Sequence, residues 1–305
     1  MKPKPIWKEL IDNVHNKHLD YIQANGIGGL AFHYTSPAGL LGIISNQKIW
    51  LSDCDYLNDV SESDYFFSLA SKIFSGNKDE KTAQNLAFRS YMISSFHSNY
   101  SGEGRETFSR EIERRYVFSL SLDEDALSLW NYYTKTNDAT GYNIGFDLEK
   151  IIESIKLSSN QTLLIGRVEY NRDYQEELLR ELYNDYYDIY VKYTRPYQRK
   201  YLYAALEDNI IKYSVFMKAE SYKSETEYRI AIFEQGTSQG FRKYREKNGA
   251  FLPYIEKEIN IDSIRTIMIS PTTRADFVKS SVTDLCDNYG IKDVSVKRSS
   301  IPARY

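Results

Sequence analysis

Strand-like and helix-like segments follow one another irregularly along this chain, and that order constrains the fold more than any other feature. Short runs typical of strands cover residues 30–34, 48–52, 116–121, 142–146, 227–233, 264–269 and 294–296. Helical patterns cover residues 7–23, 39–46, 61–98, 123–133, 174–193, 197–217 and 274–289. A doubly wound parallel sheet needs a regular alternation of strand and helix, which this order lacks. The sequence therefore predicts an α+β fold.

Composition excludes several classes of protein. Hydrophobic residues make up 42% of the 305 positions and charged residues 27%, which indicates a folded chain. The net charge of -3 excludes a basic footprint spread over the whole domain, so any contact with nucleic acid must be local. Two cysteines, Cys54 and Cys286, predict neither a disulfide framework nor a cysteine metal site. The scarcity of cysteines indicates a protein of the reducing cytoplasm, and with no run approaching the ~20 apolar residues of a membrane span we expect no membrane partner.

Tyrosine is abundant, with 27 residues against 14 Phe and 3 Trp. Because a tyrosine ring packs while its hydroxyl stays wet, this excess favours broad binding surfaces. One run interleaves cations with rings and predicts a surface for single-stranded nucleic acid, where cations hold phosphates and rings stack bases: Lys192, Tyr193, Arg195, Tyr197, Arg199 and Lys200. The alternative is that these cations pair with the acidic segment 173–188 in a neighbouring helix.

Two short patterns resemble known sites. The segment Gly26 to Ala31 fits the dinucleotide fingerprint GxGxxG/A, but a helix precedes it and a strand follows, which is the reverse of the required order. We interpret it as a helix end and turn. His15, His18 and Asp12 share a helical face at a spacing that a metal could use, but the signal is weak and we expect no metal.

More informative are polar residues at predicted strand ends. His33, Tyr34 and Thr35 end a strand just before a helix, where side chains and free helix N–H groups can meet a ligand. Glu225 and Glu227 lie two apart in a predicted strand, so both carboxylates should project from one face, continued by Arg229. One-sided charge of this kind is equally typical of a solvated sheet face.

The ordered motifs of residues 30–304 resemble a bacterial domain family of unknown function. The matching segments are His33–Ser36, Trp50–Ser52, Asn58-Asp59 with Glu62, Ser119 with Ser121, Trp130 with Tyr133, Gly141–Asp147, Glu225–Arg229 and Ser300–Arg304. One departure is Tyr222, where the family usually has Trp. Asn58, Asp59 and Glu62 belong to the family pattern without an assigned chemical role, and they could cap the next helix.

The same order is similar to the ADP-ribosyltransferases of the His-Tyr-Glu branch, which includes the poly-ADP-ribose polymerases and the DarT-type toxins. That resemblance implies an ADP-ribosyltransferase-like split antiparallel sheet with inserted helices. It also implies a single elaborated domain over residues 1–305, with 174–217 as a helical insertion. NAD would be the co-substrate and Glu227 the catalytic carboxylate. The other implied site residues are Glu225 as a helper acid, Tyr133 as a stack for nicotinamide, His33 on the adenosine ribose, and Tyr34, Thr35, Ser119 and Ser121 around the dinucleotide.

The expected function is therefore NAD-dependent ADP-ribosyl transfer by a toxin or phage-defence effector. Nucleic acid is the expected acceptor, with single-stranded RNA favoured over DNA because unpaired bases can be splayed onto aromatic rings. A toxin of this kind usually has an antitoxin partner. Two alternatives stay open: a non-catalytic interaction module, and an NAD glycohydrolase with water as acceptor.

Overall fold

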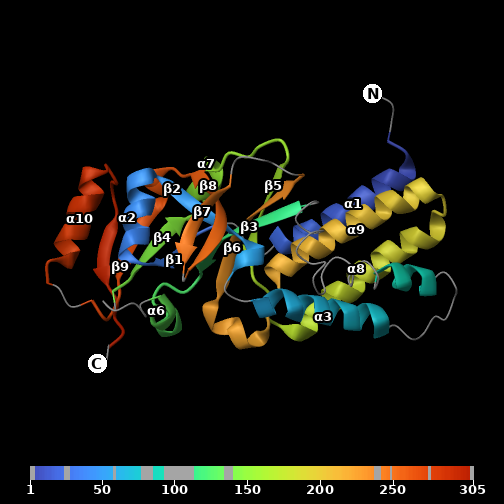
Figure 1. The fold of residues 1–305 in the computed structure, drawn as a ribbon, viewed down its shortest axis with the longest axis horizontal. Coiled ribbons are helices and arrows are strands. Elements are labelled where there is room, and N and C mark those ends of the chain that lie inside the picture. Colours follow the sequence, from blue (N-terminus) through green and yellow to red (C-terminus); the bar gives the residue numbers. More distant parts are fainter. Residues whose placement is uncertain are drawn as a thin grey trace.

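A computed structural model describes residues 4–23, 28–57, 60–76, 85–92, 113–133, 140–236, 242–247, 249–273 and 276–302. The described residues have a mixed α+β fold (Figure 1). The strands are β1 Leu30–Thr35, β2 Lys48–Asp53, β3 Glu113–Ser121, β4 Tyr142–Asp147, β5 Gln161–Arg167, β6 Glu227–Gln235, β7 Lys243–Lys247, β8 Ala250–Glu258, β9 Ile264–Ile269 and β10 Ser295–Arg298. The helices are α1 Ile6–Gln23, α2 Pro37–Asn46, α3 Val60–Gly76, α6 Leu127–Tyr133, α7 Leu148–Ser154, α8 Arg172–Lys192, α9 Pro196–Phe216 and α10 Val278–Asn288, and residues 85–92 are also helical.

The sheet forks at β3. Strand β6 pairs with β3 along its whole length, from Glu113↔Gln235 to Ser121↔Glu227. On the other edge of β3, β1 pairs only at Phe32↔Ser121, and β2 pairs only near Val117. Strands β1 and β2 therefore diverge from the same edge. Beyond the fork the order runs β10-β9-β4-β1 on one side and β2-β8-β7 on the other.

The sheet is mixed rather than purely antiparallel. Strand β10 runs parallel to β9, whereas the other described pairs are antiparallel. The expectation of an antiparallel sheet is therefore wrong at this edge. Helix α10 lies between β9 and β10 in sequence, so it provides the crossover that a parallel pair requires.

Two large cores lie on the two faces of β3 and β6. Tyr228, Ile230 and Ile232 point into a core shared with residues of α2, α7 and α10. Ala231 and Phe233 point the other way, into a core built with α1, α3, α8 and α9. Figure 1 shows α1, α8 and α9 running side by side as a bundle next to the β5–β6 end of the sheet. The segment predicted as an insertion is thus packed as one wall of a core.

Tyrosines fill much of that bundle. Tyr183, Tyr186, Tyr190 and Tyr213 are all buried. Their hydroxyls find internal partners, as in the bond from Tyr186 to the Asn209 Oδ1 atom at 2.6 Å. The expectation that the tyrosine excess forms broad binding surfaces is wrong for these residues, because a buried phenol with an internal acceptor is core material.

Local signals place several elements correctly. Ser36 caps α2 by accepting a hydrogen bond from the Gly39 backbone N–H, and Pro37 follows at the first helical position. Pro196 opens α9 in the same way. Helices α6 and α10 are shorter than predicted, while α7, β5, β7 and β8 were not predicted. Within the described ranges, no helix is long and apolar enough to cross a membrane.

Candidate functional site

His33 lies where β1 separates from β3. Its Nδ1 atom is 3.0 Å from the Ser119 carbonyl oxygen, and its ring is 4.4 Å from that of Phe118. Because a carbonyl only accepts, Nδ1 carries the proton and donates, which leaves Nε2 as an acceptor without a partner among the described residues, on a neutral ring. Burial, assisted by the charge of Arg245, lowers the pKa of His33 to about 4. The imidazole is therefore neutral at physiological pH.

Glu227 begins β6 and is only 6% exposed. Arg229 donates two hydrogen bonds to the carboxylate of Glu227, each 2.8 Å long, and the Lys218 Nζ atom lies 3.2 Å from Oε2. Burial alone would raise the pKa of Glu227, but the charges of Arg229 and Lys218 and hydrogen bonds from Arg229 and Ser119 lower it to about 2. The group is a buried, permanent anion at neutral pH.

Glu225 lies outside the strand that was predicted to hold it. It ends a 3-10 helix, Glu220–Glu225, and Thr226 then takes a left-handed conformation (φ 42°) before β6 starts. The expectation that Glu225 and Glu227 are neighbours on a strand face is wrong, whereas that of a shared face for Glu227 and Arg229 is confirmed. Lys218 nevertheless joins the two acids, because its Nζ atom is 2.6 Å from Glu225 Oε2. Both carboxylates therefore lie next to one lysine.

Tyr133 is carried by α6, which is firmly anchored. Trp130 is buried and donates its indole N–H to Asp125 at 2.7 Å. Asp125 also accepts hydrogen bonds from Ser299 and Ser300 in the C-terminal tail. One turn beyond Trp130, the Tyr133 side chain is 38% exposed. The Trp-x-x-Tyr and tail motifs thus position Tyr133.

The three residues gather from distant parts of the chain. Burial raises the pKa of the Tyr133 phenol, and the nearby negative charges of Glu227 and Glu225 raise it further. His33 bonds to the backbone carbonyl of Ser119, and the side chain of Ser119 contributes to the lowered pKa of Glu227. His33, Tyr133 and Glu227 therefore all lie near the fork in the sheet.

The remaining predicted cofactor residues support this arrangement. Tyr34 is buried, donates to the Asp123 carbonyl and accepts from the Ala126 N–H, and its ring stacks on Tyr133. Ser121 donates to the Glu225 carbonyl at 2.8 Å and so fixes the segment ahead of Glu227. Thr35 is also buried, against the first turn of α2. These side chains are buried in the walls around the site.

The basic aromatic run occupies the other end of the molecule. It covers the turn between α8 and α9, which Figure 1 shows at the end of the bundle farthest from the sheet. Lys192, Arg195, Tyr197 and Lys200 are exposed, while Arg199 lies over the ring of Tyr190 at 4.2 Å. Tyr193 is partly buried.

The alternative, in which the four cations pair with the acidic helix, is not what the described ion pairs show. Glu181 and Asp185 of α8 pair with Lys17 of α1, and Glu176 pairs with arginines of α8 itself. The cations at the tip make no ion pair with α8 among the described residues. They lie about 30 Å along α9 from Lys218, given the rise of 1.5 Å per helical residue.

The other singled-out residues have structural roles or lie outside the described ranges. His18 is buried between Tyr213 and Asp185, and His15 bonds to Asp208 at 2.5 Å. The described residues contain no cluster suited to a metal ion. A helix precedes the glycine segment and β1 follows it, as predicted. Glu62 falls in the first turn of α3, whereas Asn58, Asp59, Gly26, Ile27, Ala303 and Arg304 are outside the described residues.

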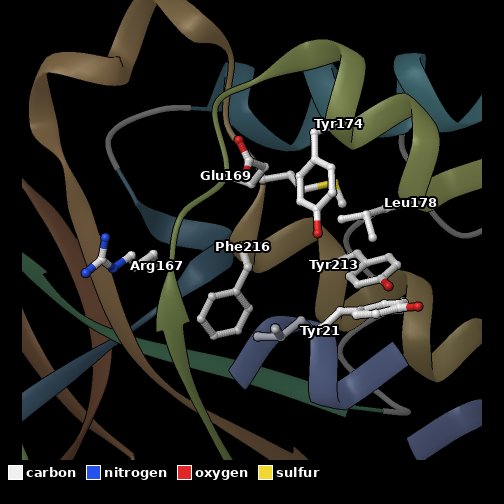
Figure 2. A pocket seen from close by; sticks show the side chains of 9 residues that line it. Tyr21, Arg167, Glu169, Tyr174, Leu178, Tyr213 and Phe216 are labelled. Carbon is white, nitrogen blue, oxygen red and sulfur yellow. The ribbon is translucent and has the colours of Figure 1, made fainter. Parts of the chain in front are cut away.

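One cavity lies elsewhere, between α1, α8 and the end of α9. Figure 2 shows Tyr21, Tyr174 and Tyr213 around it, with Arg167 and Glu169 at one side. Its volume is about 20 Å³, which is room for about one water molecule. None of the predicted site residues lines this cavity, and it is too small for a nucleotide.

Sequence reasoning missed two cations near the fork. Lys218 follows α9, and no local pattern marks it as a partner of Glu227. Arg245 lies in β7, within a hairpin that was not predicted, and its charge contributes to the lowered pKa of His33. Only a prediction of the β7–β8 hairpin could have drawn attention to Arg245.

Comparison with known proteins finds one family that matches part of the chain. Residues 129–230 match a family described as a protein of unknown function (DUF2971). The match includes Tyr133, both long helices and Glu225 to Arg229. No curated protein and no solved structure matches the chain.

Proposed function

We propose that this chain is an NAD-dependent ADP-ribosyltransferase. The observation that supports the proposal is that His33, Tyr133 and Glu227, which come from β1, α6 and β6, all lie near the fork of the sheet. Their order along the chain resembles that of the His-Tyr-Glu ADP-ribosyltransferases. Each residue also has the protonation state or exposure that its role in this chemistry needs.

Each role is the one that the resemblance implies, and a feature of the site supports it. The free Nε2 atom of neutral His33 accepts a hydrogen bond from an adenosine ribose hydroxyl. The partly exposed ring of Tyr133, held by Tyr34, stacks on the nicotinamide. Glu227 supplies a fixed negative charge to the second ribose, where positive charge develops as nicotinamide departs.

The reaction breaks the bond between ribose C1′ and the nicotinamide nitrogen, and nicotinamide leaves with the electron pair. The acceptor nucleophile then bonds to C1′ and loses its proton, which the Glu225 carboxylate accepts as the general base on the acceptor side. Glu227 accepts three hydrogen bonds, one from Lys218 and two from Arg229, on a carboxylate that can accept about four. A ribose hydroxyl can take the remaining position, and Lys218 can also yield because its shorter bond is to Glu225.

Nucleic acid is the proposed acceptor, with single-stranded RNA favoured over DNA. The exposed cations and Tyr197 at the α8–α9 tip suit a flexible strand better than a folded protein. Such an enzyme fits a cytoplasmic toxin or phage-defence effector that an antitoxin restrains. An NAD glycohydrolase would use the same site with water as acceptor.

A non-catalytic interaction module is the second candidate. It is favoured by the buried ion pairs of Glu227 with Arg229 and Lys218, which a purely structural ion cluster would also show. NAD consumption distinguishes the two proposals.

The first prediction uses NAD labelled on its adenosine part. Wild-type protein with single-stranded RNA should release nicotinamide and label the RNA. Glu225→Gln should lower label transfer about 100-fold, a usual contribution of a general base, and lower nicotinamide release by less than about tenfold. Glu220→Gln, an exposed acid of the same 3-10 helix, is the control.

Two outcomes would contradict this scheme. If wild type releases no nicotinamide with RNA, DNA or cell extract, the enzymatic proposal fails and the interaction module replaces it. If Glu225→Gln lowers transfer and release equally, the two carboxylates act as one unit.

The second prediction concerns the tip of the bundle. The double variant Lys192→Glu with Lys200→Glu should weaken binding of single-stranded RNA and lower the slope of log K against log salt by about 1.4, or ~0.7 for each lost phosphate contact. The melting temperature should stay within about 2 °C, because both side chains are exposed. Lys279→Glu with Lys292→Glu, near the opposite end of the molecule, is the matched control. RNA binding that is unchanged in the tip variant would exclude the tip as the binding surface.

A further inference from the structure

We propose that Arg245 binds the diphosphate of the dinucleotide on the same face of the sheet as Glu227. This inference rests on the proposed function and adds to it the group that recognises the charged part of the substrate. It is carried by strand register, by the unfilled bonding capacity of Arg245 and by its neighbours.

Strand register places Arg245 and Glu227 on one face. Directly paired residues share a face, as do residues two apart along a strand. Ser52 pairs with Val117, which pairs with Ala231, so the Ser52 face is also that of Arg229 and Glu227. On the other side of β2, Ser52 pairs with Tyr254, which pairs with Lys243, and Arg245 lies two residues beyond. Arg245 and Glu227 therefore flank the fork from opposite sides on a common face.

Arg245 has unused hydrogen-bonding capacity. Its Nη2 atom donates to the Ser52 Oγ atom at 2.9 Å, and its Nε atom is buried without a hydrogen-bond partner. Across the described ranges it forms no ion pair, whereas Arg242 pairs with Asp53 and Arg229 with Glu227. A partly buried guanidinium without a carboxylate is costly unless an anion completes it.

The neighbours of Arg245 are those of the proposed site. Burial lowers the pKa of Arg245, and the nearby phenols of Tyr133 and Tyr254 oppose this. Its own charge acts on His33. Arg245 is thus within electrostatic reach of the residues assigned to the two ends of NAD, where the linking diphosphate must pass.

The type of cation also fits a diphosphate. The planar guanidinium of arginine presents N–H groups that match two phosphate oxygens, whereas lysine acts as a point charge. The hydrogen bond to Ser52 fixes one N–H group of Arg245, which reduces the entropy lost on binding. The serine of the Trp-Leu-Ser motif thereby gains a role as a positioning residue.

The test measures binding of ADP-ribose, which carries the diphosphate but cannot lose nicotinamide. In calorimetric titrations, Arg245→Ala should raise the Kd of ADP-ribose about 10-fold to 100-fold, as expected for charged hydrogen bonds. Arg245→Lys should recover part of the loss. Lys243→Ala, which removes the same charge from the same strand and face, should change the Kd less than about threefold. Nicotinamide alone should bind wild type and Arg245→Ala equally, and melting curves check that each variant is folded.

The outcomes separate this inference from the proposed function. An unchanged Kd of ADP-ribose in folded Arg245→Ala overturns the inference even if NAD is consumed. If Arg245→Ala weakens only the binding of a single-stranded oligonucleotide, the anion is the acceptor backbone and the inference is also overturned. If ADP-ribose binding depends on Arg245 but wild type releases no nicotinamide, the inference stands and the transferase proposal fails.

Discussion

Replacing Glu227 by glutamine is expected to lower NAD consumption at least about 100-fold. An amide keeps the shape of the side chain but loses the charge that stabilises the ribosyl cation, and loss of one such electrostatic contact commonly costs about 10²–10³-fold in rate. The charge is well defined, because the cations around Glu227 lower its pKa to about 2. Nicotinamide release per folded molecule, measured across pH 6 to 8, is the readout.

The same substitution should also destabilise the fold, so a matched control is needed. Removing the Glu227 charge leaves Arg229 and Lys218 buried with a weakened counter-charge, and breaking a buried pair in this way costs about 3–5 kcal/mol. Asp208→Asn provides the comparison, because Asp208 also holds a buried lysine, Lys212, but lies in the helical bundle. Asp208→Asn should lower the free energy of unfolding and leave turnover per folded molecule unchanged. Equal turnover losses in both variants would mean that Glu227 acts only through stability.

Much of the fold near the site was predictable because its signals are local. Ser36-Pro37 marks the start of α2, Pro196 marks the start of α9, and alternation in 227–233 marks β6 as a strand. The same alternation correctly placed Glu227 and Arg229 on one face. It failed for Glu225, because Thr226 turns the chain through a left-handed conformation that the residue types do not announce.

The missed parts depend on tertiary contacts. The β7 sequence Lys243–Lys247 is charged and largely exposed, so it carries no hydrophobic period, and only its pairing with β8 makes it a strand. The role of Arg245 could not be seen without that hairpin. Lys218 reaches Glu227 only because α9 ends where β6 begins, a juxtaposition set by the packing of the helical bundle on the sheet.

A second carboxylate at the opposite end of β3 shows what the cations around Glu227 achieve. Glu113 is 6% exposed and has one cation at 3.7 Å, Lys212. Its Oε2 atom is buried and has no hydrogen-bond partner among the described residues. Burial, assisted by Asp208 and opposed by Lys212 and Arg115, raises the pKa of Glu113 to about 7. The same residue type thus has a raised pKa at one end of the strand pair and a lowered one at the other.

The pKa of Glu113 predicts a stability that falls as pH rises. The pKa of Glu113 is about 7 in the folded protein and 4.5 in the unfolded chain. The folded state therefore binds the proton more tightly, and protonation stabilises it. That contribution is complete below pH 4.5 and is lost as pH rises through 7, by up to about 3 kcal/mol. His33 has a lowered pKa and changes the stability in the opposite direction over part of this range, so the free energy of unfolding of wild type against pH does not report Glu113 alone.

The difference in free energy of unfolding between Glu113→Gln and wild type removes the histidine contribution. Urea unfolding should show the variant gaining about 2–3 kcal/mol over wild type between pH 5 and pH 8, and a difference independent of pH would mean that Glu113 is already ionised in the folded protein.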